Sequence, residues 1–378
     1  GIDQHLSLLS SGQFTTMLDL RISEICNFGC QHCIAVEAKK HGSIMRIEQA
    51  ARIIDTYVNF LNKLSPNNRI IDVHFGIAEP LVAFEQLKQV ILYIDDVYGH
   101  FQRYYSINTN LSLLTLSMAK FFQQHDVQIH ASIDGLKESN DLIRTFKNGS
   151  GTFDSIIDSM RLLNSIGYPL HDIGVTITNK NYRKFIEQVD EFVGWCSDVM
   201  IKEVACEFDL THLSISVDEK IAFLMSLIDK LEGVGIDLDG TWGIPYHNLV
   251  NATYANSAFA FCKGASGINL SVDLNGDVFL CSCSSKKICS IFSIPDEISP
   301  NGRFYKHVHS KLLGPRNECS GCCIEGCCVG QCSVTREYHP YMDKMVLEQC
   351  EFYRKITMAL LERDAKLLVK GGGFDEGT

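Results

Sequence analysis

A repeated alternation of strand and helix patterns through the first half of the chain limits its possible folds more than any other feature. Short apolar runs alternate with segments in which apolar residues recur at steps of three and four, as on the buried face of a helix. Strands are expected at 14–23, 70–76, 104–109, 127–133, 172–177 and 198–204. Helices are expected at about 47–61, 84–98, 114–124, 152–166 and 181–194. Strand–helix units in this succession predict an α/β fold with a parallel sheet covered by helices, either an open doubly wound sheet or a partial barrel.

Four short motifs lie at the carboxyl ends of expected strands. They are "CNFGCQHC" (26–33), "GIAEP" (76–80), "NTN" (108–110) and "SIDG" (132–135). In parallel α/β folds, ligands bind at the carboxyl ends of the strands, which meet at one edge of the sheet. The sequence therefore predicts that these motifs share one functional site.

Charge and hydropathy exclude two classes of partner. The chain has 34 Lys and Arg residues against 45 Asp and Glu residues and no long basic run, which argues against binding to nucleic acid. No apolar run reaches the roughly 18 residues that a membrane helix needs, and the first residues lack the pattern of an export signal. We therefore expect a cytoplasmic protein that is not bound to a membrane.

The cysteines divide the chain into zones. There are sixteen, and eleven of them lie from Cys262 onward. In a reducing compartment, so many thiols indicate metal or redox chemistry rather than disulfides. The C-terminal zone has few apolar runs, so we expect it to need metal to fold. The expected divisions are a barrel at 1–217, a helical bridge at 218–261, a Cys-rich domain at 262–355, and a C-terminal helix with a frayed tail at 356–378.

Three thiols, Cys26, Cys30 and Cys33, are spaced C-x3-C-x2-C on the first loop. A structural zinc site needs four ligands, so this triad alone would leave one metal position open. On a cubane, three thiolates would leave the fourth iron free for an outside ligand. The alternatives are three ordinary thiols, or a zinc site completed by His32 or His41.

This spacing at the end of a first strand resembles the radical S-adenosylmethionine (SAM) superfamily. The resemblance implies a partial (βα)6 TIM-like barrel in which Cys26, Cys30 and Cys33 hold a [4Fe–4S] cluster whose open iron binds SAM. One electron from the cluster would cleave SAM, and the 5′-deoxyadenosyl radical would abstract hydrogen from a substrate. In such enzymes the cofactor carries the difficult step and the protein supplies orientation.

The other strand-end motifs resemble the SAM-binding stretches of this superfamily. "GIAEP" is similar to Gly-Gly-Glu-Pro, with Ile77 in place of the second glycine, and "NTN" is similar to Thr-Asn-Gly, with Leu111 in place of the glycine. The SAM-binding residues that the resemblance implies are Gly76, Glu79, Asn108, Asn110, Ser132 and Arg144. Taken singly, each motif is also ordinary cap or turn chemistry, and Arg144 has the alternative of a surface salt bridge.

Seven C-terminal cysteines, spaced C-x13-G-x4-C, then C-x2-C-x5-C-x3-C and a final cysteine, resemble the SPASM extension of peptide-modifying radical SAM enzymes. The resemblance implies two auxiliary iron–sulfur clusters. Cys262, Cys281 and Cys332 would bind the first, and Cys319, Cys322, Cys328 and Cys350 the second. Seven thiolates are one short of eight, so Cys283, Cys289, Cys323, Cys327 or a substrate thiolate would complete the set. The alternative is a pair of zinc ribbons. Cys196 and Cys206 lie outside every motif and are expected to be buried thiols.

The resemblance implies an oxidoreductase that modifies a ribosomally made precursor peptide and takes electrons from a donor such as flavodoxin or ferredoxin. An intrapeptide cross-link, as a thioether, C–C or C–O bond, is the expected product. Alternatives are peptide epimerisation, formylglycine formation, modification of a tetrapyrrole or small metabolite, and a zinc-stabilised binding scaffold. Ser282 stands where formylglycine-forming relatives carry a carboxylate, which counts against that reaction. Only 25 residues precede Cys26, so the peptide is expected to be recognised by the barrel mouth, the C-terminal zone or a separate protein.

Overall fold

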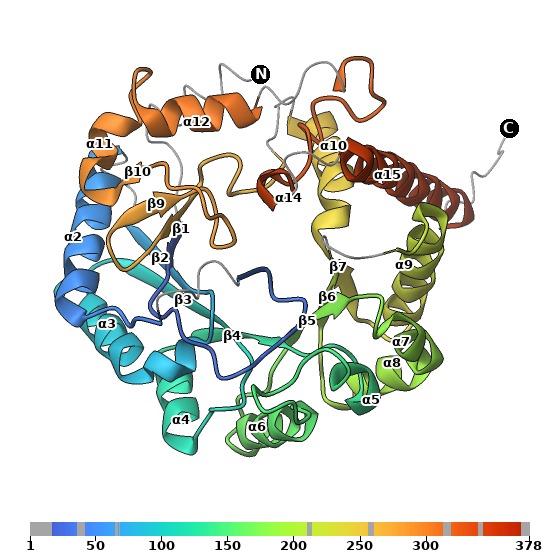
Figure 1. The fold of residues 1–378 in the computed structure, drawn as a ribbon, viewed down its shortest axis with the longest axis horizontal. Coiled ribbons are helices and arrows are strands. Elements are labelled where there is room, and N and C mark those ends of the chain that lie inside the picture. Colours follow the sequence, from blue (N-terminus) through green and yellow to red (C-terminus); the bar gives the residue numbers. More distant parts are fainter. Residues whose placement is uncertain are drawn as a thin grey trace, which may run out of the picture.

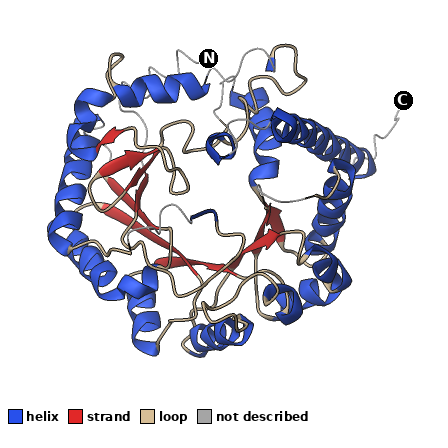
Figure 2. Ribbon diagram, in the orientation of Figure 1, coloured by secondary structure: helices blue, strands red, loops and turns tan. Residues whose placement is uncertain are grey.

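The computed structural model describes residues 17–35, 42–64, 67, 69–209, 214–255, 261–312, 319–338 and 343–371. Its ribbon runs most of the way round a ring (Figure 1). Strands line the inside of the ring and helices cover the outside (Figure 2). All described strands belong to a ten-stranded sheet in the order β10-β9-β8-β1-β2-β3-β4-β5-β6-β7. This arrangement confirms the expected α/β partial barrel.

The barrel consists of neighbouring parallel strands joined by helices. Its strands are β1 (Met17–Leu20), β2 (Ile70–Phe75), β3 (Gln102–Thr109), β4 (Val127–Ser132), β5 (Asp172–Ile177), β6 (Glu203–Phe208) and β7 (Asp237–Asp239). Its helices are α2 (Ile47–Leu64), α3 (Phe84–Val97) after the short η2 (Pro80–Ala83), α4 (Leu116–Gln124), α5 (Lys137–Asn140), α6 (Phe153–Ser165), α7 (Tyr182–Glu187), α8 (Val189–Asp198) and α9 (Val217–Glu232). Each long helix buries one apolar stripe against the sheet, as the periodicity predicts.

The sixth strand was expected at 198–204, and this placement is wrong. Helix α8 continues to Asp198, and β6 begins at Glu203. The apolar residues between them form a turn, because Met200 has a left-handed φ of 66° and the Ile201 amide donates back to the Cys196 carbonyl at 2.9 Å. The helix expected at 181–194 is divided at Gln188 into α7 and α8.

The C-terminal part continues the sheet on the other side of β1. Strand β8 (Asn269–Val272) pairs in parallel with β1, and β9 (Asp277–Phe279) and β10 (Cys289–Ser290) follow in antiparallel order. Its helical elements are η3 (Thr241–Gly243), α10 (Ile244–Ala255), η4 (Ile291–Ser293), α11 (Ile294–Glu297), α12 (Arg303–Leu312), α14 (Ser333–Tyr338) and α15 (Asp343–Gly371).

The C-terminal part and the barrel share one hydrophobic core. Leu280, Val308, Phe352 and Ile356 belong to the same cluster of buried side chains as the barrel strands. None of the helices in the described residues combines the length and apolar character needed to cross a membrane. The expected frayed tail lies, beyond Gly371, outside the described residues.

Candidate functional site

The three-thiol loop leaves the carboxyl end of β1 and is anchored by backbone contacts. The Gly29 amide donates to the Thr145 carbonyl at 2.8 Å, and the Glu79 amide donates to the Ile25 carbonyl at 3.0 Å. Phe28 is buried and packs edge-to-face on Phe146, with ring centroids 5.0 Å apart. The loop therefore holds its thiols on a fixed backbone between the ends of β1 and β2 and the segment after β4.

Hydrogen-bond donors surround two of these thiols. The Cys26 sulfur accepts from the Phe28 amide at 3.4 Å and from Asn110 Nδ2 at 3.9 Å. The Cys30 sulfur accepts from Arg144 Nη1 at 3.9 Å. Burial raises the pKa of Cys30 to about 11, although the Arg144 charge opposes this effect. Burial therefore favours the neutral thiol of Cys30, and positive charge near the sulfur, such as that of Arg144, favours the thiolate.

Three thiols from one anchored loop fit an iron–sulfur cluster better than a single zinc ion. No three His, Cys, Asp or Glu side chains within the described ranges converge on one possible ion position. His41, the other histidine considered as a zinc ligand, lies outside the described residues. In a cubane each thiolate binds a different iron, so its ligands do not have to converge on one point.

Glu79 joins the ends of β2 and β3 beside this loop. Its carboxylate is fully buried and accepts hydrogen bonds from Thr109 Oγ1 at 2.7 Å, the Leu81 amide at 3.0 Å and the Asn110 amide at 2.8 Å. Asn110 Nδ2 in turn donates to Asn27 Oδ1 at 2.9 Å. Burial raises the pKa of Glu79 to about 6, against the effect of these hydrogen bonds. The structure thus brings Glu79 and Asn110 together with Cys26.

The two departures from the glycine pattern keep the backbone conformation that glycine favours. Ile77 has φ of 64° and Leu111 has φ of 61°. The left-handed region is disfavoured for residues with a side chain, most of all for a β-branched one. The chain therefore follows a glycine-like path at both strand ends, although neither residue is glycine.

Arg144 is buried, so the surface salt bridge considered for it is wrong. Its Nε and Nη2 donate to the two Asp134 oxygens at 2.8 Å and 3.0 Å, and Asp134 also accepts from the Thr176 amide at 2.8 Å. His32 Nε2 lies 3.5 Å from Asp134 Oδ2. Asp134 thus orients Arg144 toward the cysteine loop. Sequence analysis did not single out Asp134, although it is the third residue of the "SIDG" motif.

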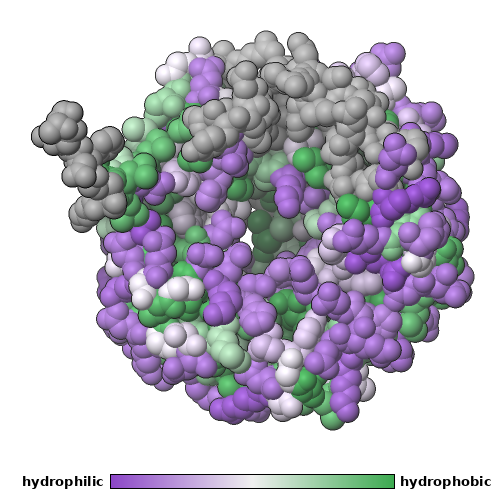
Figure 3. All heavy atoms as spheres, turned by 180° about the vertical axis from the view of Figure 1, so that it is seen from behind, coloured by the Kyte–Doolittle hydropathy of each residue, from purple (hydrophilic) through white to green (hydrophobic). Residues whose placement is uncertain are grey.

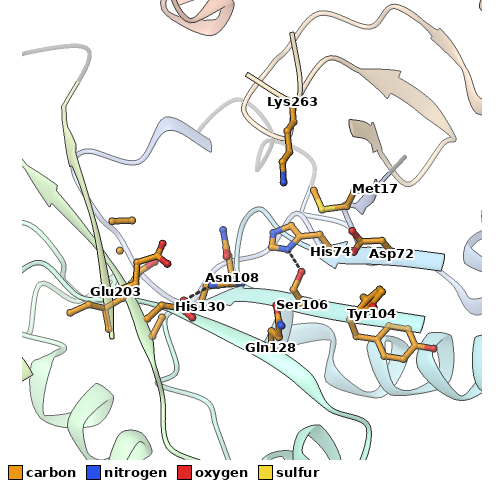
Figure 4. A pocket seen from close by; sticks show the side chains of 17 residues that line it. Met17, Asp72, His74, Tyr104, Ser106, Asn108, Gln128, His130, Glu203 and Lys263 are labelled. Atoms are coloured by element: carbon orange, nitrogen blue, oxygen red, sulfur yellow. Dashed lines mark hydrogen bonds and ion pairs between the residues drawn. The ribbon is translucent and has the colours of Figure 1, made fainter. Parts of the chain in front are cut away.

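Two of the three remaining expected SAM residues lie at the interior cavity of the barrel. Asn108 and Ser132 line this cavity of about 520 Å³. Its labelled side chains point in from β1 to β4, β6 and the segment before β8 (Figure 4). A Cβ added at Gly76 would lie 2.9 Å from His74 Nε2 and 3.1 Å from Asp19 Oδ1, so the glycine keeps this gap open. The molecule is hollowed at its centre, with many hydrophilic residues round the recess (Figure 3).

The cysteines expected to bind the first auxiliary cluster lie near one another. Cys332 interacts electrostatically with Cys262 and Cys281, and burial raises the pKa of Cys332 to about 11. Cys283 contacts Cys281, and this sulfur–sulfur hydrogen bond lowers the pKa of Cys283. Of the four candidates for the missing thiolate, Cys283 is thus the one that the structure places in this group. Cys289 lies apart in β10, where Glu297 and Arg303 are its charged neighbours.

The cysteines expected to bind the second cluster form another group. Cys328 interacts electrostatically with Cys350 and Cys319, and the Cys322 amide donates to the Cys319 carbonyl at 3.0 Å. Gln331 Nε2 donates to the Cys350 sulfur at 2.7 Å. Two other thiols also have assigned positions: Cys323 is exposed and Cys327 is buried. The expectation that Cys196 and Cys206 are buried thiols is confirmed, since both are fully buried.

Arg21 connects β1 to the first C-terminal cysteine group, and sequence analysis missed it. Its Nη2 donates to the carbonyls of Cys281 at 2.9 Å and Ser284 at 3.0 Å, and its Nε donates to Ser271 Oγ at 3.2 Å. The guanidinium also lies 4.0 Å from the centre of the Phe279 ring. The signal available in the sequence was the place of Arg21 at the end of an apolar run. An arginine in a buried segment needs hydrogen-bond or charge partners, so this place indicated a specific contact.

Comparisons with known proteins agree with the fold. Residues 20–192 match the sequence profile of the Radical SAM superfamily. The radical SAM cyclopropyl synthase TigE of Paramaledivibacter caminithermalis is 22% identical over 96% of this chain and 78% of its own length. The solved structure of anSMEcpe with bound AdoMet and Cp18Cys peptide has a TM-score of 0.66 at 19% identity, covering 89% of this chain and 98% of that chain. The solved structure of Streptococcus suis SuiB bound to precursor peptide SuiA has a TM-score of 0.61 at 15% identity, and the match covers 89% of this chain and 76% of the SuiB chain. These two structures share the fold described above.

Proposed function

We propose that the chain, whose residues 20–192 match the radical SAM superfamily profile, removes hydrogen from a ribosomally made peptide and joins the resulting carbon to another atom of the same peptide. The observation that carries this proposal is the anchored loop of Cys26, Cys30 and Cys33 with Asn110 and Arg144 donating to its sulfurs. Such a loop supports a [4Fe–4S] cluster with one iron left for SAM. When bound, the two cofactors supply a 5′-deoxyadenosyl radical that takes a hydrogen atom from a C–H bond.

The residues around the loop would hold and orient these cofactors. Gly76, Glu79, Asn108, Asn110, Ser132 and Arg144 are our proposed SAM-binding residues. Glu79 contributes by fixing the backbone at the ends of β2 and β3, because three donors engage its carboxylate. The paired contact with Asp134 holds the Arg144 guanidinium in one orientation, with Nη1 toward Cys30.

The C-terminal cysteines would hold two auxiliary clusters. We propose Cys262, Cys281 and Cys332 as ligands of the first, with Cys283 as its fourth thiolate, and Cys319, Cys322, Cys328 and Cys350 as ligands of the second. Joining two atoms of a peptide removes two hydrogens. One leaves as an atom, and the other leaves as a proton and an electron. Clusters beside the barrel would provide the electron acceptor that this balance requires, and an external donor such as flavodoxin or ferredoxin would supply the starting electron.

Relatives support a peptide as the substrate. The anSMEcpe structure holds a Cp18Cys peptide, and SuiB is bound to precursor peptide SuiA. The match to TigE covers 96% of this chain and favours a second candidate product, a cyclopropyl group. That product is also a C–C bond made within one peptide, so both candidates require the same loss of two hydrogens.

SAM cleavage by anaerobically purified protein tests the proposal. With a chemical reductant, the wild type should form 5′-deoxyadenosine, and Cys26→Ala, Cys30→Ala and Cys33→Ala should each abolish it. Cys196→Ala, which removes a buried thiol of α8, is the matched control and should retain cleavage. Full activity in any of the three loop variants would refute the cluster assignment. Co-expression with a short peptide encoded beside the gene should lower the peptide's mass by two hydrogens.

A further inference from the structure

The inner face of the barrel carries two rows of polar side chains where a parallel sheet is usually apolar. Register partners across β1 to β4 are Asp19, His74, Ser106 and Gln128. Register partners across β3 to β6 are Asn108, His130, Asp172 and Glu203. All of these except Asp19 line the cavity, and Met17, on the same face of β1 as Asp19, lines it too. The sheet therefore places polar groups side by side round one interior space.

Most charges of this space are offset by neighbours. His130 Nδ1 contacts the Asp172 carboxylate, and this hydrogen bond raises the pKa of His130, so the two charges pair. Lys263 reaches into the cavity from the segment before β8 (Figure 4) and opposes the effect of burial on the pKa of Asp72. Burial lowers the pKa of His74 and so disfavours a positive charge on its ring.

Two further carboxylates each have a positive neighbour, Arg21 near Asp19 and His130 near Glu203, but neither carboxylate has all its oxygens engaged by hydrogen bonds from the described residues. Glu203 lies at the exposed start of β6, and its carboxylate has no hydrogen bond or ion pair with the described residues. Asp19 is only 4% exposed, and its Oδ1 has no hydrogen-bond partner among the residues that the structure describes. Arg21, directly after the same strand, directs its Nε and Nη2 to Ser271, Cys281 and Ser284 instead.

The unpartnered oxygen of Asp19 faces the cavity side of the sheet. Asp19 is the register partner of His74. Both Asp19 Oδ1 and the His74 ring lie next to Gly76, because a Cβ added at Gly76 would be 3.1 Å from Asp19 Oδ1 and 2.9 Å from His74 Nε2. A buried carboxylate with an unsatisfied oxygen is costly unless a donor, best a cationic one, reaches it. A long side chain with a charged end can enter from the strand starts and bring that donor.

We propose that the barrel cavity holds a basic side chain of the substrate, whose ammonium or guanidinium group pairs with the buried Asp19. Glu203, at the exposed start of β6, attracts this positive group to the mouth of the cavity. The inference rests on the proposed function only in taking the occupant to be part of a peptide. It assigns a chemical class to the residue that enters the barrel beneath the cysteine loop.

Binding of small peptide mimics to the unreduced, anaerobically purified protein tests this inference. The probes are Nα-acetyl-arginine methylamide and Nα-acetyl-lysine methylamide, with the neutral Nα-acetyl-citrulline methylamide for comparison, and saturation-transfer NMR titration gives each Kd. At least one basic probe should bind about ten-fold or more tightly than the citrulline probe. Asp19→Asn should reduce the ratio of the citrulline Kd to the basic-probe Kd to near one. Glu203→Gln should reduce this ratio several-fold, and its effect should be largest at low salt.

Asp154→Asn is the matched control, because Asp154 is an exposed carboxylate of α6 paired with Lys137, and it should bind like the wild type. Equal affinity for all three probes, or unchanged binding by both Asp19→Asn and Glu203→Gln, would overturn the inference. If Asp19→Asn does not fold, Glu203→Gln still decides.

SAM cleavage measured on the same samples separates the two proposals. Cleavage without preference for a basic probe would refute the cavity assignment alone. Preference for a basic probe without cleavage would refute the proposed function alone.

Discussion

At the scale of single residues, the site combines a strained backbone with a buried acid. Ile77 holds a left-handed conformation that costs a β-branched residue roughly 1–2 kcal/mol. Residues held in such conformations cluster where the surrounding structure fixes a functional backbone. Here the fixing groups are the Glu79 carboxylate and the Glu79 amide, which binds the Ile25 carbonyl.

Ile77→Gly should therefore leave the free energy of unfolding unchanged or raise it by up to about 1 kcal/mol, because relief of strain offsets the entropy of glycine. Ile186→Gly is the control, since Ile186 is an exposed residue inside α7 and its replacement should cost about 1 kcal/mol. Urea denaturation measures both. A loss at residue 77 as large as that at residue 186 would contradict the strain argument.

The raised pKa of Glu79 gives a pH dependence with a defined sign. Its folded pKa of about 6 exceeds the ordinary value of 4.5, so the folded protein binds the proton more tightly than the unfolded chain. Stability from this residue is therefore fully present well below pH 4.5 and is lost as pH rises through 6 and above, by about 2 kcal/mol in total. Denaturation of wild type and Glu79→Gln across this range should show their difference changing by that amount. A difference independent of pH would refute it.

At the scale of elements, sequence patterns predicted the parts but not the contacts between distant parts. Helical periodicity and apolar runs placed five of the six expected barrel strands. The sixth strand failed because the apolar residues at 199–201 fill a turn, whose backbone conformation leaves no pattern in the sequence. The pairing of β8 with β1 and the contact of Arg21 with Cys281 span about 250 positions, which no local pattern encodes.

The polar lining of the barrel was present in the sequence as an alternation. Asp72 and His74 in β2, and Gln128 and His130 in β4, alternate with apolar residues, whereas a strand buried on both faces is apolar throughout. Attention to these interruptions would have predicted a polar lumen. The charge balance round Asp19 still depends on three-dimensional neighbours.

Two cysteines of the β9–β10 region should respond differently to substitution. Cys283 lies with Cys281 and Cys332, so Cys283→Ala should lower the iron and sulfide content of anaerobically purified protein and alter its visible spectrum. Cys289→Ala, in the neighbouring β10, is the control and should keep the wild-type content. Equal iron in the two variants would exclude Cys283 as a ligand.

At the scale of the whole molecule, the barrel and the C-terminal part are joined by one core rather than by a linker. Phe352 of α15 packs edge-to-face on Phe208 of β6, with ring centroids 5.8 Å apart. Lys220 of α9 and Glu348 of α15 form an ion pair at 3.0 Å. Two parts that share a core are expected to lose structure together.

Phe352→Ala should lower the free energy of unfolding by about 3–5 kcal/mol. The whole chain should still unfold in one thermal transition, at a lower midpoint temperature than the wild type. Calorimetry and near-ultraviolet circular dichroism should report coincident midpoints. Leu368→Ala, at an exposed position of the same helix, should change stability by less than about 0.5 kcal/mol. Two separated transitions in Phe352→Ala would show that the halves unfold independently.

Strand β1 has a consequence for attempts to recombine this protein with its relatives. It pairs Asp19 with His74 of β2, leads into Arg21 with its bonds to the carbonyls of Cys281 and Ser284, and then runs on to Cys26. A chimera that exchanges the C-terminal half at a boundary near residue 217 would pair this arginine with foreign carbonyls. Exchanges that transfer β1 together with residues 269–284 should preserve the contacts of Arg21 with Cys281 and Ser284. Engineering of this molecule therefore has to treat these two segments, far apart in sequence, as one unit.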